Sequence, residues 1–181
     1  MDHFLEEVVV KKKRVLDDIV FYFTAVIMVV TAVLGMFEVS GFISAIAIGQ
    51  FAWLDLAFGI VQLGIAALLF FFRDRLRTEY EYTFTNGTLD FAQVYNNRKR
   101  KSLGSLKVGN VDAFGKVSSQ SFQRYVSMPG IKQFRWFLNR EAELYYFFFA
   151  KDGNKKLIIM EPSEEMVSNI RHYLPFGANQ D

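Results

Sequence analysis

A short basic run is the feature of this sequence whose residue types most directly suggest chemistry. The stretch Tyr95–Lys101, YNNRKRK, ends in four consecutive cations: Arg98, Lys99, Arg100 and Lys101. Guanidinium and ammonium groups bind phosphate oxygens, so the run is a candidate contact for anionic lipid head groups, with nucleic acid a more distant alternative. A run of this length is also typical of a solvated turn between two strands.

Other chemistry is sparse. The chain has no cysteine, and its two histidines, His3 and His172, lie near opposite ends. Three carboxylates gather in the stretch EPSEE at residues 161–165, where a helix N-terminus explains them. Too few polar groups converge to make an active site. We therefore predict that the chain is not an enzyme and holds no cofactor and no metal.

Two long apolar runs occupy the first half of the chain. Residues 19–37 carry no charge, and residues 51–72 are interrupted only by Asp55 and Gln62 among strongly polar side chains. A bilayer core about 30 Å thick needs about 20 helical residues, so each run is long enough to span it. A signal peptide has a shorter apolar stretch and a cleavage site, and a buried soluble helix normally shows a polar stripe. We predict two transmembrane helices.

The flanks of these runs predict an orientation. Residues 11–14, KKKR, precede the first run, and Arg73, Arg75 and Arg77 follow the second within a basic anchor at residues 73–77. The connection at residues 38–50 has no lysine or arginine. Because positive charge is retained inside, we expect both termini in the cytoplasm and the connection outside, in a bacterial inner membrane.

Polar residues within the runs allow two interpretations. An ionisable residue inside a span suggests function, but Asp55 lies next to the interface-favouring Trp53 and fits the outer surface better. Gln62 lies deeper, and we expect it to hydrogen-bond the other helix. Thr31 and Gly35 form a small-residue pair that suits close helix packing, whether within the hairpin or between copies.

Residues 78–174 read as a small cytoplasmic domain. Tyr80, Tyr82 and Phe84 alternate with polar residues, and Asn86-Gly87 is a strong hairpin signal. We count about seven short strands, one of them at residues 121–128, before an amphipathic helix capped by Ser163. The fold class is α+β: a transmembrane helical hairpin, then a seven-stranded bent sheet or barrel closed by a C-terminal helix. Residues 1–18 are predicted as an interfacial helix or an extension of the first span, and residues 175–181 as a tail.

Seven strands followed by a capping helix resemble the pleckstrin-homology-like (PH-like) architecture. The stretches EYEYTFTNGTLDFAQVYNNRKRKSLGSL and LIIMEPSEEMVSNIRHYLP are similar to bacterial PH-like domains. The whole layout resembles an uncharacterised family of two-span membrane proteins of Gram-positive anaerobes. The resemblance implies a cytoplasmic interaction module without catalysis, and it supplies no binding residues.

Strand geometry connects the basic run to the membrane. Eight residues from Thr78 to Thr85 extend about 26 Å from the anchor at about 3.3 Å per residue, and the next strand returns the chain over the same distance. We therefore expect Arg98–Lys101 to lie beside the arginines of the anchor and to dock the domain against anionic lipid. The predicted function is a membrane-anchored binding or scaffold module that contacts the membrane surface, a protein partner or another copy. The alternative is a small subunit of a transport or envelope complex that acts through its helices.

Overall fold

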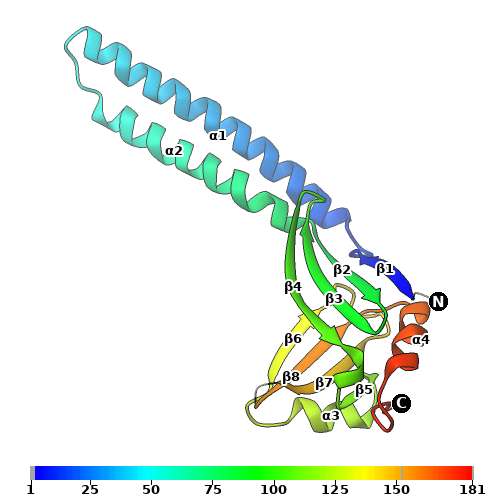
Figure 1. Ribbon diagram of the computed structural model, residues 1–181. Coiled ribbons are helices and arrows are strands. Elements are labelled where there is room, and N and C mark those ends of the chain that lie inside the picture. Colours follow the sequence, from blue (N-terminus) through cyan, green and yellow to red (C-terminus); the bar gives the residue numbers. More distant parts are fainter. Residues whose placement is uncertain (1–2, 152, 181) are drawn as a thin grey trace. The chain divides into compact units, whose positions relative to one another are not determined.

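The computed structural model describes residues 3–151 and 153–180 of the chain. The chain divides into two compact units, one formed by Lys13–Thr78 and the other by Met1–Lys12 together with Glu79–Asp181. We call them the helical unit and the sheet unit. The helical unit is thus inserted into the sequence of the sheet unit, between its first strand and the rest (Figure 1).

The helical unit is a hairpin of two helices. Helix α1 spans Val15–Ala47, helix α2 spans Trp53–Phe72, and a 3-10 turn, η1, spans Arg73–Leu76. At about 1.5 Å per residue, the 20 residues of α2 extend about 30 Å. Helix α1 continues through the expected connection at residues 38–50 and ends before Gly49, whose positive φ of 76° breaks the helix. The connection between the two helices is therefore shorter than predicted, because the charge of Glu38 does not end helix α1.

Two glycines let the helices approach closely. A Cβ atom on Gly35 would lie 2.9 Å from Cγ of Leu63 and 3.0 Å from the carbonyl oxygen of Gly59. A Cβ on Gly59 would lie 3.0 Å from the carbonyl oxygen of Gly35. Closure of the hairpin therefore uses Gly35, whereas the Thr31 hydroxyl donates back to the carbonyl oxygens of Ile27 and Met28 in its own helix.

Three contacts define the register of the hairpin. Arg77 pairs with Asp18 at its base, Gly35 meets Gly59 in its middle, and the rings of Phe42 and Trp53 lie 5.3 Å apart near its tip. In this register Glu38 and Asp55 fall at nearly the same level, toward the tip.

The sheet unit contains two four-stranded sheets among the described residues. In the first sheet the strand order follows the sequence: β1 (Phe4–Val9), β2 (Thr78–Thr85), β3 (Thr88–Tyr95) and β4 (Lys99–Lys107). In the second the order is β5 (Ala113–Lys116), β7 (Tyr145–Lys151), β8 (Asn154–Met160) and β6 (Lys132–Trp136). Strands β6 and β8 pair in parallel, whereas β1 with β2, β3 with β4, β5 with β7, and β7 with β8 pair antiparallel. Asn86-Gly87 forms the predicted turn, with φ values of 46° and 82°.

Aromatic side chains fill the space between the sheets and the terminal helix. Helix α4 (Glu164–Tyr173) is capped by Ser163, whose hydroxyl accepts from the backbone N–H of Met166 at 3.2 Å. Its buried residues Met166, Val167 and Ile170 join Tyr82, Phe84 and other side chains in the main core. Helix α3 (Gln120–Val126) covers the other face of the second sheet. Because both faces of β7 are covered, Tyr145–Phe148 form a continuous buried run.

The structure corrects three sequence-based expectations. Residues 4–9 form a strand paired antiparallel with β2, with Phe4 opposite Thr85, so the predicted N-terminal helix is wrong over this segment. The predicted strand at residues 121–128 is mostly helix α3. The turn-rich stretch before it contains the short strand β5, and the described strands number eight rather than seven.

Candidate functional site

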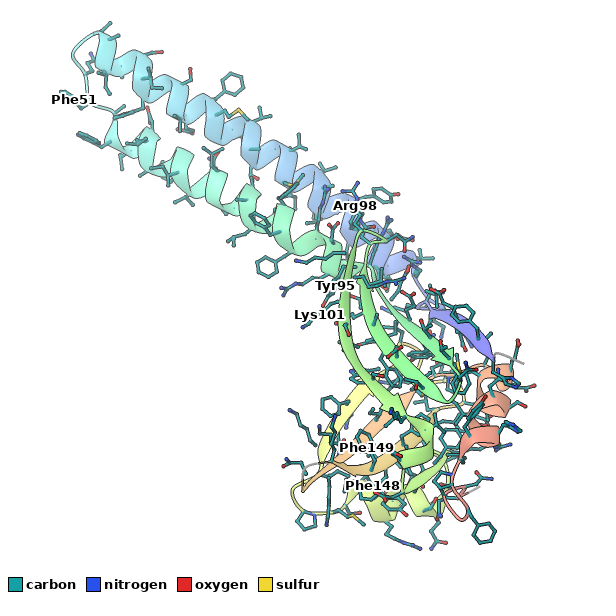
Figure 2. The ribbon with its side chains drawn as sticks, viewed as in Figure 1. Phe51, Tyr95, Arg98, Lys101, Phe148 and Phe149 are labelled. Carbon is teal, nitrogen blue, oxygen red and sulfur yellow. The ribbon has the colours of Figure 1, made fainter. Side chains whose placement is uncertain are left out.

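The basic run lies on the hairpin that joins β3 to β4. Asn96 and Asn97 adopt left-handed φ values of 50° and 52°, and the Arg98 N–H donates to the carbonyl oxygen of Tyr95 at 3.0 Å. Asparagine tolerates this conformation, which explains the tight turn after Tyr95. Figure 2 shows Tyr95 and Arg98 at the tip and Lys101 on the strand that leaves it. Because β2 and β3 are joined by a two-residue turn, this tip lies at the end of the sheet where β2 begins.

Arg100 differs from its basic neighbours. Its guanidinium donates to the carboxylate of Glu81, and its Nη2 lies 3.8 Å from Oε1 of Glu6. Glu81 has only 4% of its side chain exposed, whereas Arg100 has 64% exposed. Burial and the adjacent Glu6 raise the pKa of Glu81, and Arg100 opposes that rise. Arg100 therefore fastens the β3–β4 hairpin to the β1–β2 pair.

The other three cations of the run are available for contact. Arg98, Lys99 and Lys101 are exposed, and in the part of the chain that the structure describes none of them forms an ion pair. A cavity of about 410 Å³ beside the hairpin mixes Arg98 and Arg100 with carboxylates, including Glu81. Such mixed charge does not suit a buried phosphate, so the contact surface for anions is the exposed hairpin itself, not this cavity.

The three arginines of the anchor contact aromatic and acidic residues of the helical unit. Arg77 lies 2.8 Å from Oδ1 of Asp18, and its guanidinium carbon lies 4.0 Å from the centre of the Phe21 ring. Arg73 lies over the rings of Phe21 and Phe70, and Arg75 lies 4.6 Å from the centre of the Phe72 ring. The arginines and Arg98–Lys101 thus form two groups, one in each unit. The anchor arginines stabilise the base of the helical hairpin through ion-pair and cation–π contacts.

The two polar residues of the second apolar run have different surroundings. Asp55 is exposed in the first turn of α2, two residues after Trp53, where a carboxylate is favourable to the helix dipole. Gln62 lies near the middle of α2, and its Oε1 is buried without a hydrogen-bond partner among the described residues. The expected hydrogen bond from the other helix to this oxygen is therefore absent from the described structure. Thr31, a polar side chain of α1 that could have provided it, bonds its own backbone.

A polar network that the sequence patterns did not indicate attaches β1 to the second half of the sheet unit. Glu161 is buried and accepts from the N–H of Asn139 at 2.9 Å and from its side-chain amide at 2.8 Å. The same amide donates to the carbonyl oxygen of Val10 at 2.9 Å and accepts from the N–H of Lys12 at 2.8 Å. Asn139 lies 129 residues from Val10 and 127 residues from Lys12 in the sequence, so no local pattern could have revealed these contacts.

The fold and the inserted helices define a PH-like sheet domain interrupted by an apolar helical hairpin. Comparison with family models agrees with this description: the model described as "Bacterial PH-like domain (DUF6106)" matches residues 1–179. The chain belongs to this family, and both units lie within the matched region. No curated protein and no solved structure matches the chain significantly.

Proposed function

We propose that this protein is a membrane-anchored binding module whose PH-like domain contacts the anionic surface of the bilayer through the β3–β4 hairpin. The observation that carries the proposal is the insertion of an apolar helical hairpin between two paired strands of one sheet. Only 11% of the most apolar segment of each helix is buried within the molecule, which supports a lipid environment for these helices over a place in a soluble core.

The pairing of β1 with β2 supports the predicted topology. Strand β1 leads into α1, and the chain returns from α2 through η1 into β2. A spanning hairpin must therefore begin and end on the side that holds the domain. Basic residues 11–14 and 73–77 flank the hairpin at that end, which favours the cytoplasm for both termini. The level shared by Glu38 and Asp55 is then near the outer surface, with Asp55 in contact with water.

Three exposed cations supply the anionic contact in this proposal. Each of Arg98, Lys99 and Lys101 contributes about 1 kcal/mol near an anionic surface, and salt screens the attraction. Arg100 contributes indirectly, by holding the hairpin in place through Glu81. Specific recognition of one head group is not expected, because the adjacent cavity has mixed charge.

Full-length protein in nanodiscs tests this contact. The chain has no cysteine, so Ser102→Cys accepts a single dye at an exposed position of β4. We expect quenching by head-group quenchers in anionic nanodiscs, reduced by salt and lost when Arg98, Lys99 and Lys101 become glutamine. Neutralising Lys107, Lys151 and Lys155 removes the same charge elsewhere and should leave the quenching intact. Equal quenching in neutral nanodiscs, or in the triple hairpin variant, would refute the contact.

A second candidate function rests on Gln62. A buried amide oxygen with no partner among the described residues is costly in a bilayer and suggests that the second apolar run does more than anchor the chain. In this alternative the chain is a small subunit of a transport or envelope complex. Loss of the cellular phenotype in Gln62→Leu or Asp55→Asn, with the sheet unit still folded and membrane contact unchanged, would favour it over the first proposal.

A further inference from the structure

Strand β1 is an edge strand whose outer side faces away from β2. The N–H of Asn86 donates to the carbonyl oxygen of His3 at 3.0 Å, so His3 points its backbone groups toward β2. In an antiparallel pair this direction alternates, and Leu5, Glu7 and Val9 share it. The N–H and C=O groups of Phe4, Glu6 and Val8 therefore point to the open edge. Val10 confirms the alternation, because its carbonyl oxygen accepts from Asn139 on that side.

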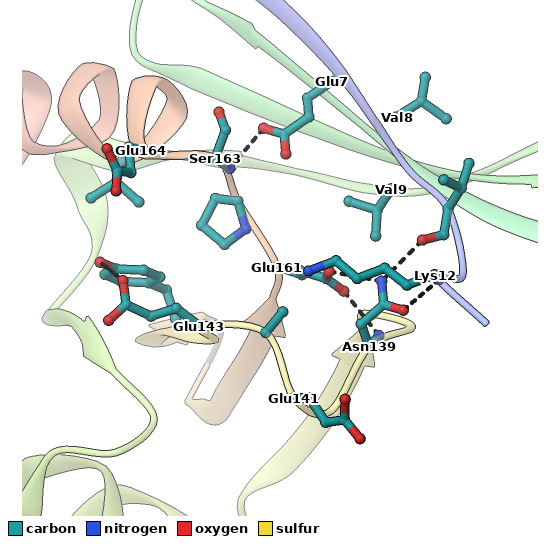
Figure 3. A pocket seen from close by; sticks show the side chains of 15 residues that line it. Glu7, Val8, Val9, Lys12, Asn139, Glu141, Glu143, Glu161, Ser163 and Glu164 are labelled. Carbon is teal, nitrogen blue, oxygen red and sulfur yellow. Dashed lines mark hydrogen bonds between the residues drawn. The ribbon is translucent and has the colours of Figure 1, made fainter.

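A cleft of about 560 Å³ runs along this edge. One wall is residues 7–10 and Lys12. The other is formed by Asn139, residues 141–143, Tyr145, residues 161–164 and Val167 (Figure 3). Side chains fasten the two walls at two points. The Asn139 amide binds Val10 and Lys12, and the carboxylate of Glu7 accepts from the N–H of Ser163 at 3.0 Å.

The side-chain amide of Asn139 makes the hydrogen bonds that a neighbouring strand would otherwise make to residues 10–12. Its amide donates to the carbonyl oxygen of Val10 and accepts from the N–H of Lys12, which is the pair of bonds that one residue of a parallel neighbour would make. No strand is paired with the outer edge of β1 in the described sheets, and the outward groups of Val8 lie between the two fastening points. An edge of this kind readily accepts an extended chain.

The charge of the cleft indicates which kind of extended segment it can bind. Its lining contains one cation, Lys12, and five carboxylates: Glu7, Glu141, Glu143, Glu161 and Glu164. Glu143 forms an ion pair with Lys116, so the lining keeps an excess of negative charge without it. This excess of negative charge disfavours lipid phosphates and nucleic acid. It also disfavours a second copy of the same edge, which would bring its own Glu6 and Glu7 against these carboxylates. A segment with lysine or arginine on alternate residues has the complementary charge and the matching period.

We propose that this cleft binds an extended basic segment of a protein partner, which bonds the outward backbone groups of Val8 and places its cations beside Glu141 and Glu164. The inference deepens the proposed role as a membrane-anchored binding module by adding a protein-binding surface to the lipid-facing hairpin. The two surfaces have opposite charge, and none of Arg98, Lys99 and Lys101 lines the cleft.

Fluorescence polarisation with the full chain in uncharged detergent tests this proposal. The probe is a labelled octapeptide of alternating lysine and valine. One comparison peptide replaces lysine by glutamate, and another replaces valine by proline, which keeps the charge but removes N–H donors. We expect saturable binding of the lysine–valine peptide, and at least tenfold weaker binding of both comparison peptides.

Variants of the cleft separate the backbone contact from the charge contact. Glu141→Gln with Glu164→Gln should weaken binding at least tenfold, and Val8→Pro should do the same if it folds. Asp90→Asn with Glu165→Gln, which removes equal charge away from the cleft, should stay within twofold. Absence of saturable binding, or equal binding by the lysine–proline peptide, or wild-type affinity in the Glu141/Glu164 variant, would overturn the proposal. None of these outcomes changes the quenching expected at Ser102→Cys, so failure here is distinguishable from failure of the lipid contact.

Discussion

Arg100 and its neighbours Lys99 and Lys101 have the same charge but different surroundings. The two lysines project from the hairpin without an ion pair in the described structure, whereas Arg100 neutralises a buried carboxylate. A variant that neutralises the whole basic run would therefore change both the surface charge and the stability of the hairpin. Experiments on lipid contact should leave Arg100 in place.

The first prediction concerns the role of Arg100 in stability. Arg100→Gln leaves Glu81 buried next to Glu6, and we expect it to lower the free energy of unfolding by about 2 kcal/mol. Thermal unfolding of the detergent-solubilised chain, followed by near-ultraviolet circular dichroism, measures the loss. The matched control, Arg98→Gln, should change stability by less than about 0.5 kcal/mol, as for other exposed residues. In the double variant with Glu81→Gln, most of the loss should be recovered, and equal losses in the single and double variants would contradict the pairing.

The second prediction is a dependence of stability on pH through Glu81. In the folded chain the pKa of Glu81 lies above its ordinary value of 4.5, because of burial and Glu6. The folded state therefore holds the proton more tightly, and this contribution to stability is full below about pH 4.5 and is lost as pH rises through the raised pKa. Glu81→Gln does not titrate, so its stability relative to the unchanged chain should increase from pH 4.5 to pH 7. A constant difference across melts in this range would contradict the assignment.

The candidate site was only partly predictable at the level of residues. The sequence showed that four cations follow an asparagine turn, and the structure has that turn. It could not show that Arg100 pairs with Glu81, because that contact depends on the register of three strands. The roles of Asn139 and Glu161 depend on still more distant contacts, with Val10 and Lys12.

At the level of elements, the helical hairpin depends on the contact between Gly35 and Gly59. The third prediction is that Gly35→Val forces the helices apart and destabilises the hairpin by about 1–3 kcal/mol, as expected for overpacking. The midpoint of helix unfolding in detergent, followed by far-ultraviolet circular dichroism, measures this. Gly64→Val is the matched control, because nothing lies within 4 Å of a Cβ built there. Similar effects of the two substitutions would show that the helices do not pack as described.

The fourth prediction concerns the attachment of β1. Asn139→Ala removes the hydrogen bonds to Val10 and Lys12 and one to the buried Glu161, and we expect a loss of about 2 kcal/mol. Backbone amides of residues 4–9 should then exchange hydrogen faster than those of β7. Gln133→Ala, on an exposed position of β6, is the control. Unchanged exchange in β1 would contradict the fastening role of Asn139.

Elements with strong local signals were predictable, and elements that depend on distant partners were not. The Asn86-Gly87 hairpin and helix α4 follow from turn and capping residues close in sequence. Strand β1 was missed because its partner β2 lies beyond the helical unit, and its adjacent apolar residues also fit a helical face. Residues 121–128 were predicted to form a strand, but residues 120–126 form helix α3, whose apolar side chains Phe122, Tyr125 and Val126 pack against the second sheet.

At the level of the whole molecule, the sheet unit is built from the segment before the helical unit and the segment after it. A fragment of residues 78–181 lacks β1 and exposes the edge of β2 and the cavity left by Val9, which is 5% exposed in the full chain. The fifth prediction is that this fragment aggregates or melts at a lower temperature than a chain in which residues 13–77 are replaced by a flexible linker. Size-exclusion chromatography and thermal unfolding compare the two, and equal behaviour would show that β1 is dispensable.

Cysteine accessibility in intact cells tests the central claim most directly, namely that the inserted hairpin spans the membrane and holds the PH-like domain on its inner side. The cysteine-free chain permits single substitutions at two exposed positions, Gln50→Cys in the connection between the helices and Ser102→Cys in β4. With a membrane-impermeant maleimide, we expect Gln50→Cys to react in intact cells and Ser102→Cys to react only after lysis. Labelling of Ser102→Cys from outside, or protection of Gln50→Cys until lysis, would contradict this topology.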